Sequence, residues 1–511
     1  MMMDRARHSF CPRKLAAWLM AAMFISTAAV REVSGQTQQA STPGVQERFL
    51  EEQLRPLIVP ELRSPEAENR CRYDFGGVLR HTGLWFEDHG PDINSPFIRG
   101  GEFQGYLQAN DLDLRPWLSV NVDGVHYGFI RGQLDFLQYC SGDSFDRNSD
   151  WRGPFVDLGF YRLDIDRALD EYHGWYIDGW SADVTVGRQF LYVGRGIAYS
   201  LVADAVSTDW VCGPWAGMAF ASQSIRHFDN IDLSVPGFSR SDREFCGAQI
   251  EYEGFDHWKP YFYAVVERDR SEESPEDPGQ EFDYDSEYYG WGLQGEAMFE
   301  CREARWGIPN LQYFAEFIVE RGDSFGIDAT ESQDPIRSWA MDVGLVYYGK
   351  GSTKPRYLVE FAQATGDSNR SSPQNTAIGN AAGTTDRGFL GFGFLNTGFS
   401  FAPLFANLEF ARVAASCRPC PETHWWNLKE LEIGASCFAF WRPEEDGGIS
   451  DIRADVSGHH YLGSEVDFYA TWRLSTDLYL MTNYGTFFPD TGSFSVERSR
   501  QFLSFSLVWL F

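Results

Sequence analysis

The sequence predicts an all-β fold, a single transmembrane antiparallel up-and-down β-barrel of about 18 strands. Polarity alternates with a period of two along many segments, for example residues 125–139 and 464–473, which is typical of strands with one apolar face. Many segments run roughly 11 to 16 residues, whereas strands of soluble sandwiches have ~5 to 6 and a tilted membrane strand needs ~9 to 11. Short and long connections also alternate, as in barrels whose tight turns and long loops lie on opposite sides of a membrane.

The N-terminus has the pattern of a secretory signal peptide over residues 1–35. A basic stretch precedes the uncharged run LAAWLMAAMFISTAAV, residues 15–30, and small residues come before Gln36. The run is shorter than the ~20 residues that a spanning helix needs. A retained N-terminal anchor is the alternative.

Residues 36–70 differ in composition from the rest of the chain. They begin with a polar, turn-forming stretch, and Pro56 and Pro60 interrupt the short helical pattern that follows. We expect a periplasmic tail or plug segment here, with disorder as the alternative. The outer-membrane barrel itself is expected to span residues 71–511.

The charge balance excludes one class of function. The chain has 43 basic and 73 acidic residues, a net charge of −30. A broad nucleic-acid-binding face needs clustered Lys and Arg to neutralise phosphates, so no nucleic-acid partner is expected.

The connections support an even number of strands. Asp123-Gly124 is a two-residue hairpin signal, whereas residues 88–103 and 366–400 are examples of long connections. The piece GFLGFGFLNTGFSF, residues 388–401, is assigned to a long loop, because counting it as a strand would make the total odd. The segment 166–180 is then the one long connection on the side of the short turns.

The final segment, RQFLSFSLVWLF, is the most apolar dozen residues of the mature chain. Read by twos, one face carries Leu503, Phe505, Leu507, Trp509 and Phe511, and Ser504 and Ser506 lie on the other. A closing strand that ends in an aromatic, here Phe511, suits an outer-membrane barrel whose apolar face is solvated by lipid. The expected partners are therefore outer-membrane lipid and, through this strand, the barrel-assembly machinery.

Several segments resemble one family of outer-membrane barrels. VTVGRQFLYVG (184–194) followed by VADAVSTDW is similar to the Gly-Arg-Gln strand and succeeding strand of the alginate export family. LVEFAQATGD (358–367) resembles its acidic strand and Gly-Asp loop, and residues 462–490 resemble its penultimate strands. The resemblance covers most of the chain from about residue 72 and implies an eighteen-stranded barrel in the bacterial outer membrane, with arginines that line a channel for an anionic polysaccharide.

The less apolar face of each strand supplies the candidate pore-lining residues, except for Arg188, which a bulge at Gly187 would turn inward. They are Arg72, Arg80, Arg115, Arg131, Arg188, Arg268, Arg356, Arg442, Arg473, Asp135, Glu316, Glu360, Glu465 and Asp467. Counted over all the clear strands, these faces carry fifteen carboxylates against eight arginines. Opposite charges ~4 Å apart attract by ~4 kcal/mol at an effective dielectric of 20. Pairing between strands is therefore the alternative to a polyanion route, which needs arginines gathered at a constriction.

Arg188 is a special case. Strict alternation from Val184 and Val186 places it on their lipid-facing side, where an unpaired charge costs ~2 to 4 kcal/mol at mid-membrane. Gly187 offers a bulge that would shift the phase. We expect Arg188 to face the lumen or to lie at the membrane boundary.

No catalytic or cofactor motif is present: H-E-x-x-H, G-x-S-x-G and the P-loop are all missing from the sequence. The acidic segment 267–287 lacks the spacing of an EF-hand, so no metal is expected. Eight cysteines follow the signal peptide; Cys417 and Cys420 could form a local disulfide or pair elsewhere.

Two classes of function remain. The preferred one is an outer-membrane, porin-like channel, not an enzyme, that passes small solutes or an anionic oligosaccharide or polysaccharide such as alginate. The alternative is a secreted soluble β protein that binds or cleaves carbohydrate. Aromatic positions discriminate between them, because membrane girdles lie at outward-facing strand ends, whereas sugar platforms gather in one cleft.

Overall fold

The computed structural model describes most of the chain from residue 71 onward. The described residues are 71–87, 106–142, 150–225, 243–270, 284–301, 304–327, 333–370, 380–423, 425–451, 454, 459–494 and 498–511. The predicted signal peptide (1–35) and the predicted tail or plug (36–70) lie outside them.

The wall consists of long strands. They are β1 (Cys71–Glu87), β2 (Tyr106–Val122), β3 (His126–Gly142), β4 (Asp150–Asp164), β5 (Trp180–Tyr192), β6 (Ser200–Cys212), β7 (Trp215–Gln223), β8 (Arg243–Tyr252), β9 (Trp258–Asp269), β10 (Asp285–Cys301), β11 (Ala304–Ile327), β12 (Gln333–Tyr348), β13 (Arg356–Ala364), β15 (Leu408–Cys417), β16 (Leu431–Trp441), β17 (Tyr461–Arg473), β18 (Leu478–Pro489) and β19 (Arg500–Leu510).

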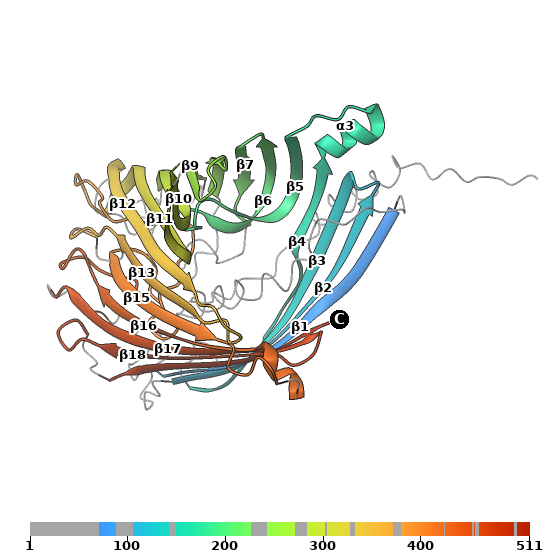
Figure 1. Cartoon of the computed structure of the whole chain (residues 1–511). Helices are drawn as coiled ribbons and strands as arrows, with labels where there is room; N and C mark the ends of the chain where they lie inside the picture. Colours follow the sequence, from blue (N-terminus) through green and yellow to red (C-terminus); the bar gives the residue numbers. More distant parts are fainter. Residues whose placement is uncertain are drawn as a thin grey trace, which may run out of the picture. The chain divides into compact units, whose positions relative to one another are not determined.

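Each wall strand pairs antiparallel with its neighbours in the chain, and the first and last strands close the ring (Figure 1). Val78 of β1 lies opposite Leu510 of β19. Among the described residues, the segment β14 (Asn380–Ala381) pairs with the end of β11, in parallel, and is not part of the wall. The predicted fold is confirmed: the protein is a closed antiparallel barrel of 18 strands.

The two rims differ in their connections. One rim, here called the turn rim, carries short turns such as residues 123–125, 213–214 and 474–477. The other, the loop rim, carries longer connections such as residues 365–407 and 442–460. Residues 388–401 lie within a loop-rim connection, as predicted, and contain no strand.

The exception at residues 166–180 also lies where it was expected. It contains α3 (Ile165–His173), between β4 and β5 on the turn rim. The side chain of Asp164 accepts a hydrogen bond from the backbone N–H of Arg167, and Gly174 ends the helix in the left-handed conformation at φ 67°. In the described part of the chain, no helix has the length and apolarity of a membrane span.

The outer face of the wall is apolar. In β19, Leu503, Phe505, Leu507 and Trp509 are exposed, whereas Ser504 and Ser506 are buried on the inner face. The same alternation exposes apolar side chains around the ring: Val186, Val206, Phe262, Trp291, Phe317, Val343, Leu345, Val359, Val413 and Phe468. An apolar surface that surrounds the whole barrel suits contact with lipid.

Exposed aromatic residues lie near the strand ends. Trp215, Trp258, Tyr348, Tyr357 and Trp509 lie at the turn rim, and Trp151, Tyr192, Tyr461 and Phe488 at the loop rim. Two such rows at opposite rims are the girdles of a transmembrane barrel. The aromatic positions therefore favour the membrane channel over the soluble sugar-binding protein.

Candidate functional site: the charged lumen and the loop inside it

The inner face of the first four strands carries a ladder of alternating charges. Arg80 contacts Asp111 at 3.3 Å and Asp113 at 3.1 Å, and Nε of Arg115 donates to Asp113 at 2.7 Å. The ladder continues through Asp157, which lies 3.6 Å from Arg115 and 2.6 Å from Arg131. Further along, Asp135 lies 4.0 Å from Arg152. The structure thus brings Arg80, Arg115 and Arg131 together on one part of the wall, each beside a carboxylate.

Four other predicted arginines belong to the inward-facing positions of their strands but lie at the strand ends. Arg72, Arg356 and Arg473 are exposed at the turn rim, and Arg72 lies 4.0 Å from Asp74. Arg473 donates to the backbone oxygens of Ser475 and Thr476. Arg442 lies just beyond β16 at the loop rim, where it is buried and donates to the backbone oxygen of His459 at 2.6 Å. The structure does not gather these four at one level of the lumen.

Arg188 and Arg268 do not line the pore, which corrects that assignment for both; the other expectation for Arg188, a place at the membrane boundary, stays a prediction. Arg188 shares the outer face of β5 with exposed Val186, and no bulge interrupts the pairing of β5 with β6. It forms a bidentate pair with Asp204, at 2.9 and 3.0 Å, so the charge that faces lipid is neutralised. Arg268 follows Phe262 and Val266 on the outer face of β9. The inner face carries Tyr261, Tyr263 and Glu267 and is the less apolar one, so Arg268 was assigned to the wrong face.

Gly187 is required for a different reason from the expected bulge. It adopts φ 126°, and a Cβ there would lie 2.3 Å from the backbone oxygen of Gly159 on β4. We expect Gly187→Ala to lower the free energy of unfolding by about 3 kcal/mol, since backbone strain and a clash coincide. Urea unfolding of the barrel in lipid vesicles measures this. Gly174→Ala is the control, because its φ is also positive but nothing lies within 4 Å, and it should cost only about 1 kcal/mol.

The connection between β5 and β6, residues 193–199, folds into the lumen and carries an arginine that the prediction missed. Nε of Arg195 donates to Asp342 at 2.5 Å, and Nη2 lies 3.6 Å from Glu360. Glu360 also lies 3.2 Å from Arg412. The guanidinium of Arg195 lies over the ring of Phe314, 3.5 Å from its centroid. One charged group from a loop is thus held by three wall strands, β11, β12 and β13.

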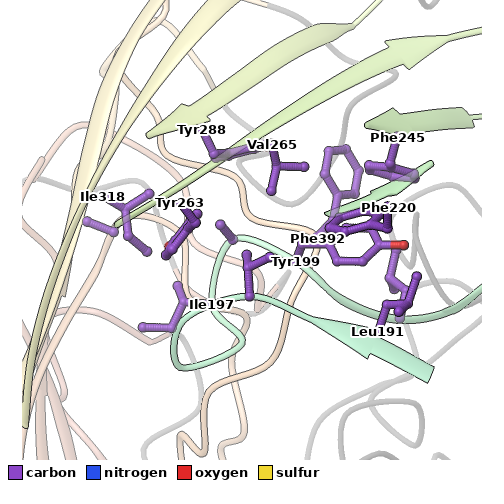
Figure 2. Close-up of a cluster of buried hydrophobic side chains, with 14 of the residues drawn as sticks. Leu191, Ile197, Tyr199, Phe220, Phe245, Tyr263, Val265, Tyr288, Ile318 and Phe392 are labelled. Carbon is purple, nitrogen blue, oxygen red and sulfur yellow. The ribbon is translucent and has the colours of Figure 1, made fainter. Parts of the chain in front are cut away.

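Glu316 fixes the backbone of the same connection. Its carboxylate accepts hydrogen bonds from the backbone N–H of Arg195 at 2.7 Å and from the hydroxyls of Tyr261 and Tyr263. Gly194 permits this approach, because a Cβ there would lie 2.4 Å from the carboxylate. Figure 2 shows Ile197 and Tyr199 of this connection beside Tyr263 and other buried side chains of the wall.

A second segment, residues 386–407, also lies inside the barrel and is called the inner loop. Its first part is fixed to β10 and β11. The backbone N–H of Leu390 donates to Glu320 at 3.1 Å, and the hydroxyl of Tyr288 donates to the backbone oxygen of Leu390 at 2.5 Å. The backbone N–H of Phe392 donates to the oxygen of Ala198 at 2.9 Å, so the inner loop and the 193–199 connection support one another.

The second part of the inner loop is fixed by one carboxylate on β17. Glu465 accepts hydrogen bonds from the backbone N–H groups of Phe399 and Ser400, each at 2.6 Å, and of Phe401 at 2.8 Å. Glu465 is fully buried, and Asp467 is buried two residues further along the same face. These two predicted residues therefore do face inward, where Glu465 binds a loop of the protein itself.

Aromatic packing completes the attachment. The ring of Phe401 stacks on Phe487 of β18 with centroids 4.2 Å apart, and Phe399 lies 6.4 Å from Phe502 of β19. At the other end, Phe392 lies 5.3 Å from Phe245 of β8. The inner loop therefore follows the inside of the wall from β8 round to β19 and narrows the lumen.

The entry to the inner loop is held by a buried ion pair. Arg370 and Asp386 lie 2.7 Å apart, and the backbone of Asp386 exchanges hydrogen bonds with residues 335 and 337 of β12. Burial raises the pKa of Asp386, and the neighbouring Arg370 opposes that rise. The pair fixes the point at which the chain turns inward.

Other chemistry is limited among the described residues. Seven cysteines carry free thiols: Cys71, Cys140, Cys212, Cys246, Cys417, Cys420 and Cys437. The described ranges contain no group of three or more His, Cys, Asp and Glu residues placed to hold a metal ion.

A closed barrel with an apolar outer face, two aromatic girdles and a charged lumen defines an outer-membrane channel for solutes. The profile of the alginate export family matches residues 145–500, more than half of the chain. The chain belongs to the alginate export family, and the protein lies in the bacterial outer membrane. This family and fold are those of channels rather than enzymes. Comparison with curated proteins finds no match.

Several solved structures have a similar fold at low sequence identity. OpdK of Pseudomonas aeruginosa, solved with vanillate, is 11% identical, with a TM-score of 0.48 and coverage of 86% of this chain and 98% of that one. OccK5 (OpdH) of the same organism is 9% identical, with a TM-score of 0.47 and the same coverages. OccAB2 of Acinetobacter baumannii is 9% identical, with a TM-score of 0.45, again over 86% and 98%.

Proposed function

We propose that the protein is a passive channel that admits small solutes past the inner loop. The observation that carries this proposal is the attachment of residues 386–407 across the inside of the wall, where they occupy part of the space that a solute would cross. A narrow lumen favours small solutes over bulky ones, and charge on its wall sets which ions enter.

Anionic sugar polymer, such as alginate, is the second candidate cargo. The match to the alginate export family over residues 145–500 favours it. The lumen argues against it, because the arginines of the ladder are each beside a carboxylate, Arg195 contacts Asp342 and Glu360, and Arg412 contacts Glu360. A polyanion route needs cations that are free to bind the polymer.

Planar-bilayer recordings distinguish the two candidates. For a small-solute channel we expect a steady conductance, no preference for chloride in a KCl gradient, and no block by purified alginate oligomers. Chloride preference together with concentration-dependent block by the oligomers would establish the anionic polymer as cargo. Absence of any conductance from correctly folded protein would refute the channel.

The orientation and the processing of the chain are also proposals. The loop rim faces the cell exterior and the turn rim faces the periplasm, as the difference in connection length indicates. Residues 1–35 are removed as a signal peptide, and residues 36–70 form a periplasmic tail or plug. The strand that ends at Phe511 is the part recognised by the barrel-assembly machinery. Mass spectrometry of the mature N-terminus tests whether the signal peptide is removed before Gln36.

A further inference from the structure

Two arginines face each other on the outside of the barrel near the loop rim. Arg321 of β11 and Arg337 of β12 are direct cross-strand partners. Both are exposed, and both share the outer face with Phe317 and Trp339, opposite in phase to the buried Glu316, Glu320 and Ser338. Their side chains therefore lie next to each other on the outer surface of the barrel. Figure 1 shows the two strands side by side.

Neither arginine forms an ion pair with the described residues. Glu287 of β10 is the cross-strand partner of Arg321, but its carboxylate accepts from Arg268 at 2.9 Å and from the hydroxyl of Tyr289 at 3.0 Å. No ion pair within the described ranges includes Arg321 or Arg337. Like charges directly opposite each other destabilise a sheet, so this pair is a cost unless an anion binds between them.

The pair lies where the apolar band ends. Toward the barrel's middle, the outer face continues with the stacked rings of Trp339, Phe317 and Trp291, whose successive centroids are 5.7 and 6.4 Å apart. Along β12 the outward side chains stay apolar from Trp339 to Tyr347. Those nine positions rise about 20 Å when tilted, close to the ~25 Å band of a membrane barrel. Arg321 and Arg337 therefore lie at the membrane boundary.

We propose that Arg321 and Arg337 together bind the phosphate of an anionic lipid in the leaflet that surrounds the loop rim. The planar guanidinium group matches phosphate geometry and donates two parallel hydrogen bonds. The acyl chains of the same lipid lie against the rings of Phe317 and Trp339. The site is on the lipid-facing surface, so it is independent of what passes through the lumen.

Native mass spectrometry of the folded, mature protein tests the site with diphosphorylated lipid A as the probe. We expect the double variant R321Q/R337Q to bind the first lipid A about tenfold more weakly than the wild type, the loss of roughly one strong charge-assisted hydrogen bond. The variant R356Q/R418Q removes two arginines at the opposite rim and should bind as the wild type does. Zwitterionic phosphatidylethanolamine should bind both proteins equally and weakly.

The unfolding temperature of each protein without lipid tests whether a loss of binding reflects a folding defect. Because R321Q/R337Q removes a repulsion, its unfolding temperature in detergent should equal or exceed that of the wild type. Added lipid A should raise the unfolding temperature of the wild type and leave that of the variant unchanged. Inorganic phosphate should have no such effect on either protein. Unaltered lipid A binding by the double variant, or equal affinity of the wild type for phosphatidylethanolamine, would overturn the proposal.

Discussion

Glu465→Ala releases the inner loop and increases the single-channel conductance. The substitution leaves the backbone N–H groups of Phe399, Ser400 and Phe401 without their acceptor. Each buried donor left unpaired costs about 1–3 kcal/mol, so together they cost several kcal/mol. A change of about 5.5 kcal/mol moves a two-state equilibrium from 1:99 to 99:1, so this loss is large enough to make the detached loop the main state. Planar-bilayer recordings should show larger and noisier current steps.

Two further variants separate detachment of the loop from a change in lumen charge. Glu432→Gln on the neighbouring strand removes an inward carboxylate that contacts Tyr469 rather than the inner loop, and its conductance should match the wild type. Glu465→Gln retains one acceptor oxygen and should give an intermediate conductance. If Glu465→Ala folds normally but conducts as the wild type does, the inner loop does not limit the current.

The wall of the barrel could be predicted from the sequence because each strand carries its own pattern of lipid-facing and inward-facing side chains. Each strand alternates apolar and polar side chains, and lipid on one side requires that alternation wherever the strand crosses the membrane. Leu503, Phe505, Leu507 and Trp509 show this directly. The even strand count, the loop at 388–401 and the placement of segment 166–180 on the turn rim all follow from that alternation and from the lengths of the connections.

The lumen was predicted less well because its contacts are between distant segments. The sequence places Glu465 and Asp467 on an inner face, but nothing local shows that Glu465 binds residues 399–401. Arg268 was assigned to the wrong face: the inner face of β9 carries the hydroxyls of Tyr261 and Tyr263 and the buried Glu267, whereas Arg268 lies on the outer face. Arg195 was missed because it lies outside the strands. Its flanking glycines, Gly194 and Gly196, both with positive φ, were the available signal of a close backbone approach.

Arg195→Ala shifts the ion selectivity of the channel toward cations and destabilises the lumen. Asp342 and Glu360 would lose a partner, and Asp342 is fully buried. Removing one member of a buried ion pair costs about 3 kcal/mol or more, since the remaining charge is uncompensated. We expect a lower urea midpoint in lipid vesicles and a reversal potential in a KCl gradient displaced toward the potassium equilibrium potential.

The double variant R195A/D342N tests whether charge is the cause. The second substitution removes one of the carboxylates that Arg195 had neutralised, so both the reversal potential and the urea midpoint should return toward the wild-type values. Arg356→Gln is the matched control, because that arginine is exposed at the turn rim and should change neither quantity appreciably. Asp342→Asn restores the charge balance but does not restore the position of residues 193–199. If the double variant is as cation-selective as Arg195→Ala, the guanidinium therefore acts by holding residues 193–199 in place.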